Sequence, residues 1–366
     1  YANNEEPGTA VVTITGHGNF TGVREVTFNI VDPDGTVVSS WDDLKQAVEA
    51  AADTTEENPL VISLAADLTA DSAEAGDGMI TLPENTFVEI VGYGHTITAE
   101  NGVFASAEQS ETGMFVVSSG SNLELRGLTL DGAYQERLLY VKAGGSADVA
   151  ADVTLTRGRA TDLTGTANPA AIGGQAVWNA GEITFAGSLE NNITASNYYG
   201  AIYNADGGKF IMTETGRIAD VHMLGYGAVY NAGEFTMDGG TITGTSLAAN
   251  AGGYGQAKAV YNVGTFTMQE GSSITENTGW FSTVSNSGTF RMEGGEISGN
   301  TNLTAEDMSW GTVYMNGGSF TMTGGSISDN KVCTKGGGIF IAAGEVTING
   351  ADARISGNQA VNDQTN

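Results

Sequence analysis

An internal repeat constrains this chain more than any other feature of its sequence. From about residue 173, one pattern returns every 24 to 31 residues. It consists of a small-residue turn, an apolar pair ending in Asn, a short Gly turn, a Phe-x-Met segment and an Ile-centred segment. The copies read AVWNAGEITF, AIYNADGGKFIM, AVYNAGEFTM, AVYNVGTFTM, TVSNSGTFRM, TVYMNGGSFTM and GIFIAAGEVTI. A period of this length indicates a solenoid of similar stacked units.

The segments inside each repeat are typical of strands. They alternate apolar and polar residues with a period of two, and Gly and Asn separate them. The third segment is centred on Ile193, Ile218, Ile242, Ile274, Ile297, Ile327 and Ile355. We therefore predict an all-β, right-handed parallel β-helix of about 10–12 coils, with three strands per coil stacked roughly 4.8 Å apart.

Identical side chains at equivalent positions predict internal stacks along this β-helix. One stack comprises Phe210, Phe235, Phe266, Phe290 and Phe320, and another Met212, Met237, Met268, Met292 and Met322. At the first turn a ladder is formed by Asn179, Asn204, Asn231, Asn262 and Asn286, with Met315 and Ile341 replacing Asn in the last two copies. Asn277, Asn300, Asn330 and Asn358 close four of the third segments. We expect the Asn side chains to satisfy backbone groups at the turns.

The chain divides into two predicted parts. Residues 1–32 read as a β-hairpin, GTAVVTITGHGNFTGVREVTFNIV, and residues 33–366 as the β-helix domain, with regular repeats over 173–360. The strands LVISLA, MITLP, FVEIVG and LELRGLTLDG begin the coil stack.

A short capping helix is predicted over residues 40–52. Ser40 is a suitable N-cap, and Asp42 and Asp43 favour a helix N-terminus. Trp41 and Leu44 lie on one apolar face together with Ala47, Val48 and Ala51. We expect this helix to cover the first coil, whose strand edges would otherwise invite aggregation.

From Trp41 to about residue 360 the chain resembles the pectate-lyase-like β-helix modules of bacterial adhesin-like cell-surface proteins. The resemblance rests on WDDLKQAVEAA, VISLAADLT, GYGHTIT, GTFTMQEGSSITEN and GSFTMTGGSISDN. The YANN start and the TITGHGNFTG turn resemble the closing part of the small immunoglobulin-like repeats of Gram-positive surface proteins. The resemblance implies a secreted, extracellular segment of a larger multidomain chain. It does not define the activity, because such modules serve adhesins and carbohydrate-active enzymes alike.

The charge balance excludes several classes of partner. Asp and Glu number 43 against 14 Lys and Arg, which gives a formal charge of −29. Such a field repels phosphate backbones and anionic lipid, so we expect no binding to nucleic acid or membrane surfaces. We expect no membrane insertion by this segment, because no stretch approaches the roughly 20 apolar residues that span a bilayer. Acidic oxygens would attract Ca²⁺, but no motif specifies a site, and we predict no cofactor. Cys333, the only cysteine, is expected to be a small buried side chain.

The sequence contains no recognisable catalytic constellation. Polygalacturonase-type β-helix enzymes use clustered Asp residues, a Gly-His-Gly and a basic-Ile-Lys motif. Here Gly16-His17-Gly18 precedes the predicted β-helix, and Gly216-Arg217-Ile218 continues with Ala219 in place of Lys. Paired carboxylates for glycan cleavage remain an alternative to a solvated acidic face. The acids near the third-segment turns are Asp220, Glu276, Asp307 and Asp329.

Aromatic residues recur in the variable loop that precedes each Asn-bearing segment. They are Tyr199, Tyr226, Tyr254, Trp280, Phe281 and Trp310. Most stand five residues before the Asn position, and equal offsets on successive coils predict one column along the axis. The column is either a stack that closes a corner of the coil or a platform for sugar rings or a protein partner.

Basic residues are concentrated between positions 126 and 159. They are Arg126, Arg137, Lys142, Arg157 and Arg159. They either neutralise the nearby Asp131, Glu136, Asp148 and Asp152 or bind an anionic sugar such as a uronic or sialic acid.

These patterns favour a non-catalytic binding segment. We expect a rigid, monomeric stalk or ligand-presenting part of a cell-surface adhesin, whose partner is a host or neighbouring-cell glycan or protein. The alternative is a glycan-cleaving enzyme, a glycoside hydrolase or polysaccharide lyase, that uses acids along one β-helix face. A third alternative is an ice- or surface-binding protein. It requires a flat Thr-rich array at regular spacing, which coil lengths of 24 to 31 residues disfavour.

Overall fold

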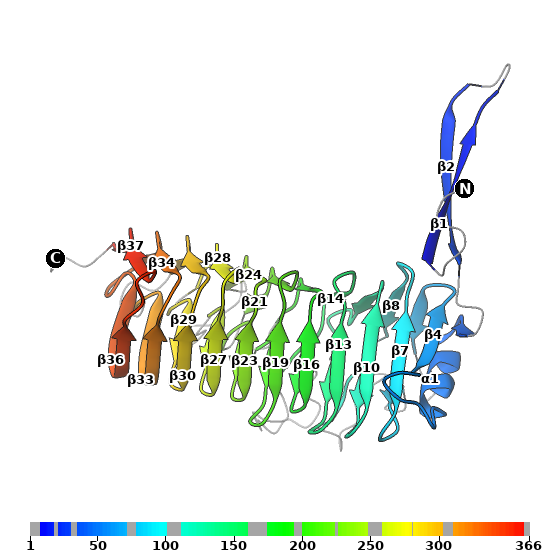
Figure 1. The fold of residues 1–366 in the computed structure, drawn as a ribbon, viewed down its shortest axis with the longest axis horizontal. Helices are drawn as coiled ribbons and strands as arrows, with labels where there is room; N and C mark the ends of the chain where they lie inside the picture. Colours follow the sequence, from blue (N-terminus) through cyan, green and yellow to red (C-terminus); the bar gives the residue numbers. More distant parts are fainter. Residues whose placement is uncertain are drawn as a thin grey trace.

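The protein forms a parallel β-solenoid of about 10 turns with one short helix and an N-terminal antiparallel hairpin. The computed structural model describes residues 8–17, 21–30, 35–71, 78–100, 111–159, 174–193, 200–223, 226–247, 258–279, 281–302 and 310–361. Figure 1 shows the coils following one another in sequence order, from the blue N-terminal end to the red C-terminal end. The predicted all-β, parallel β-helix fold is thus confirmed.

Each coil contributes up to three principal strands, which form three rows along the molecule. The first row holds β6 (Ile80–Thr81), β9 (Phe115–Val117), β12 (Leu139–Val141), β15 (Val177–Asn179), β18 (Ile202–Asn204), β22 (Val229–Asn231), β26 (Val260–Asn262) and β29 (Val284–Asn286). The second row holds β3 (Thr36–Val38), β4 (Leu60–Leu64), β7 (Phe87–Val91), β10 (Asn122–Arg126), β13 (Ser146–Val149), β16 (Glu182–Phe185), β19 (Lys209–Met212), β23 (Glu234–Met237), β27 (Thr265–Met268) and β30 (Thr289–Met292). In the last two coils β33 (Val313–Met322) and β36 (Ile339–Ile348) each pass through both rows.

The third row forms a separate sheet. It holds β5 (Leu68–Ala70), β8 (Thr96–Ala99), β11 (Thr129–Asp131), β14 (Thr154–Thr156), β17 (Ser188–Glu190), β20 (Arg217–Ala219), β24 (Thr241–Thr243), β28 (Ser273–Thr275), β31 (Glu296–Ser298), β34 (Ser326–Ser328) and β37 (Arg354–Ser356). Shorter strands follow it in some coils: β21 (His222–Met223) pairs with β25 (Ser246–Leu247), and β32 (Thr301–Asn302), β35 (Lys331–Val332) and β38 (Gln359–Ala360) form a three-stranded sheet. All pairings between coils are parallel.

The core consists of columns of like side chains, as the repeat predicts. Phe235, Phe266 and Phe290 are buried, and adjacent rings in this column stack with centroids 5.1 and 4.8 Å apart. The Met column pairs Met212 with Met237 and continues in register to Met322. Burial of these columns removes apolar surface from water at every coil, which is the main stabilisation of the stack.

Two Asn ladders are confirmed at the corners. In the first, the Nδ2 of Asn204 donates to the Oδ1 of Asn231 at 2.7 Å and also to the backbone oxygen of Glu234 at 2.9 Å. In the second, the Nδ2 of Asn300 donates to the Oδ1 of Asn330 at 2.9 Å. Within their own coils, Asn204 also donates to the backbone oxygen of Gly208 and Asn300 to that of Ser298, so each amide binds both its own coil and the next.

One predicted position is wrong. The repeat predicts Ile193 at the centre of a third-row strand, but β17 is centred on Leu189, whose register partner in the next coil is Ile218. Ile193 makes only an isolated bridge to His222. Leu189 is buried and fills the apolar column, which explains the difference because either apolar residue satisfies the pattern.

The N-terminal end of the stack is covered by α1 (Trp41–Glu49), which is shorter than the predicted 40–52. Ser40 is its N-cap, with the side chain accepting from the backbone nitrogen of Asp43 at 3.1 Å. Trp41 is buried, and its indole nitrogen donates to the backbone oxygen of Gly78 at 2.7 Å. Beyond this end, β1 (Gly8–Thr15) and β2 (Val23–Ile30) pair as an antiparallel hairpin that projects from the stack in Figure 1.

Candidate functional site

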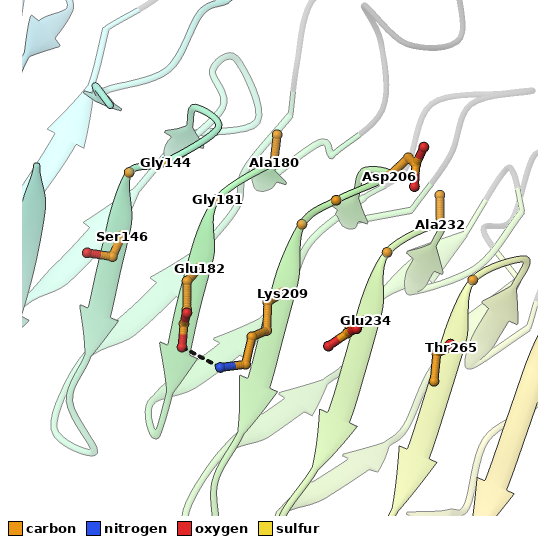
Figure 2. Close-up of a pocket in the computed structure, with 15 residues that line it drawn as sticks. Gly144, Ser146, Ala180, Gly181, Glu182, Asp206, Lys209, Ala232, Glu234 and Thr265 are labelled. Atoms are coloured by element: carbon orange, nitrogen blue, oxygen red, sulfur yellow. Dashed lines mark hydrogen bonds and ion pairs between the residues drawn. The ribbon is translucent and has the colours of Figure 1, made fainter. Parts of the chain in front are cut away.

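A groove crosses five successive coils at the corner between the first and second rows. Its volume is about 650 Å³. Its floor includes Gly145, Gly181, Gly208, Gly233 and Gly264, and its polar side chains are Ser146, Glu182, Asp206, Lys209, Glu234 and Thr265. Figure 2 shows these side chains on neighbouring coils, with Asp206 on a turn and with Glu182 and Lys209 joined across one coil step. Their carboxylate and ammonium groups lie 2.7 Å apart.

The glycines of the groove are dictated by the stacking of the coils. A Cβ on Gly181 would lie 2.1 Å from the backbone oxygen of Gly145, and one on Gly233 would lie 2.1 Å from that of Gly208. No side chain fits at such distances, so successive coils keep glycine at this corner. The floor of the groove is therefore bare backbone that runs along the axis.

The first Asn ladder lies directly beneath this groove. Asn179 is fully buried, and its Oδ1 accepts from the backbone nitrogen of Gly181 at 3.0 Å. Its Nδ2 donates to the Oδ1 of Asn204 at 2.8 Å. The ladder therefore fixes the backbone that forms the floor of the groove.

A ladder of aromatic rings occupies the outward positions of the first row, next to the groove. It comprises Tyr140, Trp178, Tyr203, Tyr230 and Tyr261, and after Ser285 it resumes with Tyr314 and Phe340. Tyr140 and Trp178 stack with centroids 4.2 Å apart at 4°, and Tyr230 and Tyr261 lie 5.3 Å apart at 11°. Because neighbouring rings cover one another's faces, the ladder presents ring edges and stabilises the coil stack.

Two of the loop aromatics predicted from the sequence, Tyr226 and Trp310, pack against this ladder. Tyr226 contacts Tyr261 edge to face at 5.5 Å, and Trp310 lies 5.6 Å from Tyr314. Phe281 meets Trp310 at 6.0 Å. Tyr199, Tyr254 and Trp280 fall outside the described residues. Whether the predicted column binds a ligand stays a prediction.

A buried lysine lies among these rings. The Nζ of Lys258 is 4.6 Å from the ring centroid of Tyr261, 5.4 Å from that of Phe281 and 6.0 Å from that of Tyr226. Burial lowers the pKa of Lys258 to about 7, because the charged ammonium is removed from water. The rings compensate in part through cation–π attraction.

Four of the five basic candidates have partners in the structure. Arg126 pairs with Glu89 at 2.9 Å and also with Glu124. Lys142 pairs with Glu111 at 2.9 Å.

The other basic candidates lie around the turn that follows β11. Arg157 forms a two-pronged contact with Asp131. The buried Arg137 donates to the backbone oxygens of Gly174 at 2.7 Å and Thr112 at 2.8 Å, which ties together three segments distant in sequence. The exposed Arg159 donates its backbone nitrogen to the oxygen of Glu136. An anionic sugar would have to displace these contacts, and its binding here stays a prediction.

Three of the four acids named as catalytic candidates occupy the same turn position, on alternate coils of the stack. Asp220, Glu276 and Asp329 each follow a third-row strand, on different coils, and Asp307 lies outside the described residues. Among the residues that the structure describes, no group of three or more His, Cys, Asp or Glu side chains is arranged to hold a metal ion. No helix in the same part of the chain is long and apolar enough to cross a membrane.

The groove and the aromatic ladder were not identified from the sequence, although both have a signal there. The residue before each ladder Asn is aromatic in VWN, IYN and VYN, and a glycine follows that Asn within two to four residues. The period-two rule places the residue before an inward Asn on the outer surface, so the outward ring ladder was deducible.

Comparisons with known proteins identify no relative of this chain. No protein-family model matches the chain, and neither the curated proteins nor the solved structures compared with it give a significant match.

Proposed function

We propose that this chain is a non-catalytic, ligand-binding stalk of an adhesin-type bacterial surface protein, and that the groove holds an extended glycan. The observation that carries the proposal is the continuous groove across five coils, floored by glycine and bordered by polar side chains. A polymer laid along the axis would meet equivalent groups at every coil, about 4.8 Å apart. Repeated weak contacts then add up along one chain.

The chemistry of the groove favours a glycan over a peptide. Ser146 and Thr265 offer hydroxyls, Glu182 and Glu234 offer carboxylates, and Lys209 offers an ammonium group. Peptides are usually anchored by apolar side chains in hydrophobic pockets, whereas the groove is lined by glycines, by Ala180 and Ala232, and by polar side chains. Hydroxyl groups of sugars can both donate to the carboxylates and accept from the ammonium group.

The stalk part of the proposal is supported by the ladders. Asn, Phe and aromatic columns join each coil to the next, so the stack resists bending and would hold a bound ligand at a fixed distance from its anchor. The resemblance of the sequence to pectate-lyase-like modules and, over residues 1–32, to immunoglobulin-like repeats implies an extracellular, multidomain setting.

The proposal is tested by filling the groove without disturbing its floor. Gly207 has φ +80, and a Cβ built on it would meet nothing within 4 Å. Because Asn tolerates this backbone conformation, Gly207→Asn should place a side chain at the groove with little loss of stability. We expect it to lower binding to a soluble-oligosaccharide array at least about fivefold, the effect of blocking one or two hydrogen-bonding positions.

Gly94→Asn is the matched control. Gly94 has φ +86 and equally open surroundings, but it lies in the turn between β7 and β8, away from the groove. Retained binding in this variant and loss in Gly207→Asn would support the site. Equal binding in both variants would reject it. Accumulation of new reducing ends or unsaturated products in the same mixtures would favour the glycan-cleaving alternative.

A further inference from the structure

The outer face of the third row carries two columns of hydroxyl groups. In the segment from β24 to β34 the first column is Thr241, Ser273, Glu296 and Ser326, and the second is Thr243, Thr275, Ser298 and Ser328. The intervening Ile242, Ile274, Ile297 and Ile327 point into the core. Seven of these eight outward side chains therefore end in a hydroxyl.

The two columns form a regular lattice. The strands pair without a register shift from β24 through β28 and β31 to β34. Hydroxyls on one strand are two residues, about 6.6 Å, apart, and those on adjacent coils about 4.8 Å apart. Thr241 and Ser273 confirm the alignment, since their hydroxyl oxygens lie 2.8 Å apart.

Variable coil length does not disturb this lattice. The coils that contain β24 and β28 differ in length, yet Thr241 pairs with Ser273 and Thr243 with Thr275. In the sequence, the additional residues fall between β25 and β26. Unequal coil lengths of 24 to 31 residues disfavour a regular array in general. They do not disfavour one on this face, because its strands stay in register.

The outward positions of this face carry little charge, as do those of the second row on the same coils. The whole chain carries a formal charge of −29, whereas Glu296 is the one charged residue among the eight outward positions from β24 to β34. A nearly neutral, hydrogen-bonding lattice complements a partner that is itself uncharged, rich in hydroxyls and periodic. A flexible single chain would not use the two-dimensional spacing, but an ordered assembly of chains would.

We propose that the outer face of β24, β28, β31 and β34 docks onto an ordered, uncharged polysaccharide, such as a crystalline fibre. The surface lies on a different sheet from the groove and does not depend on it. Many weak hydrogen bonds, direct or through water, act together because the lattice is rigid on both sides.

The test is retention of the whole chain on particles of microcrystalline cellulose and of α-chitin, compared with soluble hydroxyethyl cellulose. Thr243→Val with Thr275→Val removes two hydroxyls from one column while keeping the branched shape that suits a strand. We expect at least about fivefold weaker retention on the solid, the effect of two lost hydrogen bonds. Thr243→Ser with Thr275→Ser keeps the hydroxyls and should retain binding.

Thr236→Val with Thr267→Val is the matched control. These two residues pair in register on the same coils, but they face outward from β23 and β27 of the second row. Loss confined to the third-row pair, with Gly207→Asn still retained on the solid, would establish the face independently of the groove. The proposal is overturned by no retention of the unmodified chain on either solid, by equal loss in the two valine pairs, by equal binding to the soluble polymer, or by ice binding alone.

Discussion

At the scale of single residues, one turn position accounts for five of the ten non-glycine residues with positive φ in the described part of the chain. The residue immediately after a third-row strand is left-handed in eight coils: Arg157, Asn191, Asp220, Gly244, Glu276, Gly299, Asp329 and Gly357. Their φ values lie between 51° and 68°. Asn, Asp and Gly tolerate this conformation, whereas Glu and Arg do so only under constraint from their surroundings. The corner thus requires a left-handed residue, and only some coils have Gly, Asn or Asp at that position.

Exchanging residues between two of these corners tests the strain directly. Glu276→Gly should stabilise the protein by about 0.5–1 kcal/mol, because relief of the left-handed strain exceeds the entropy that glycine adds to the unfolded chain. Gly299→Glu should destabilise it by a similar amount, since a Cβ there would meet nothing within 4 Å and backbone strain is the remaining effect. Denaturant unfolding of both variants measures the changes. Lower stability of Glu276→Gly would contradict the account.

Lys258 predicts a pH dependence whose sign follows from its pKa. The folded-state pKa of about 7 lies below the value of about 10.4 expected in the unfolded chain. Between these values the unfolded chain binds more protons, so stability rises with pH from about 7 to about 10. Lys258→Met removes this contribution, and the difference in Tm between the two proteins should change across that window. A difference in Tm that stays constant from pH 6 to 10 would show that burial does not destabilise the charged form of Lys258.

At the scale of elements, the sequence was informative where one residue type repeats at one place in the coil. The Phe column and both Asn ladders could be predicted because each depends on a conserved offset within the repeat. Ile193 was misplaced because Leu189 offers an equally apolar strand centre four residues earlier. The groove depends on the close approach of glycine backbones from consecutive coils, a distance that no single repeat reveals. Lys258 was missed because its rings come from three different coils.

The first Asn ladder is expected to be a major source of stability. Asn231 is fully buried, and its Nδ2 donates to the Oδ1 of Asn262 at 2.7 Å and to the backbone oxygen of Thr265 at 2.8 Å. Asn231→Ala leaves several of these buried groups without partners and should cost at least about 2 kcal/mol. Asn316→Ala, at an exposed position, should change stability by less than about 0.5 kcal/mol. Equal melting temperatures for the two variants would mean that the ladder is not needed for stability.

At the scale of the whole molecule, the two ends of the stack differ. The N-terminal end is closed by α1, where Trp41, Leu44 and Val48 are buried. In the last coil Ile341 and Ile348, which continue buried columns of the core, are 53% and 49% exposed. Between these ends, the stack presents a groove at one corner and a hydroxyl lattice on another sheet. The two candidate binding surfaces thus share some coils but lie on different faces of one elongated stack (Figure 1).

The central claim is that an extended glycan lies along the groove, and its most direct test is the dependence of affinity on ligand length. Five coils about 4.8 Å apart span roughly 19 Å from first to last. With a size series of an oligosaccharide that the array retains, calorimetry should show affinity rising with length until the ligand spans this distance and then levelling off. In Gly207→Asn the rise should be smaller or stop at a shorter length. Affinity that is already complete for a single sugar unit, or that is unchanged by Gly207→Asn, would contradict the account.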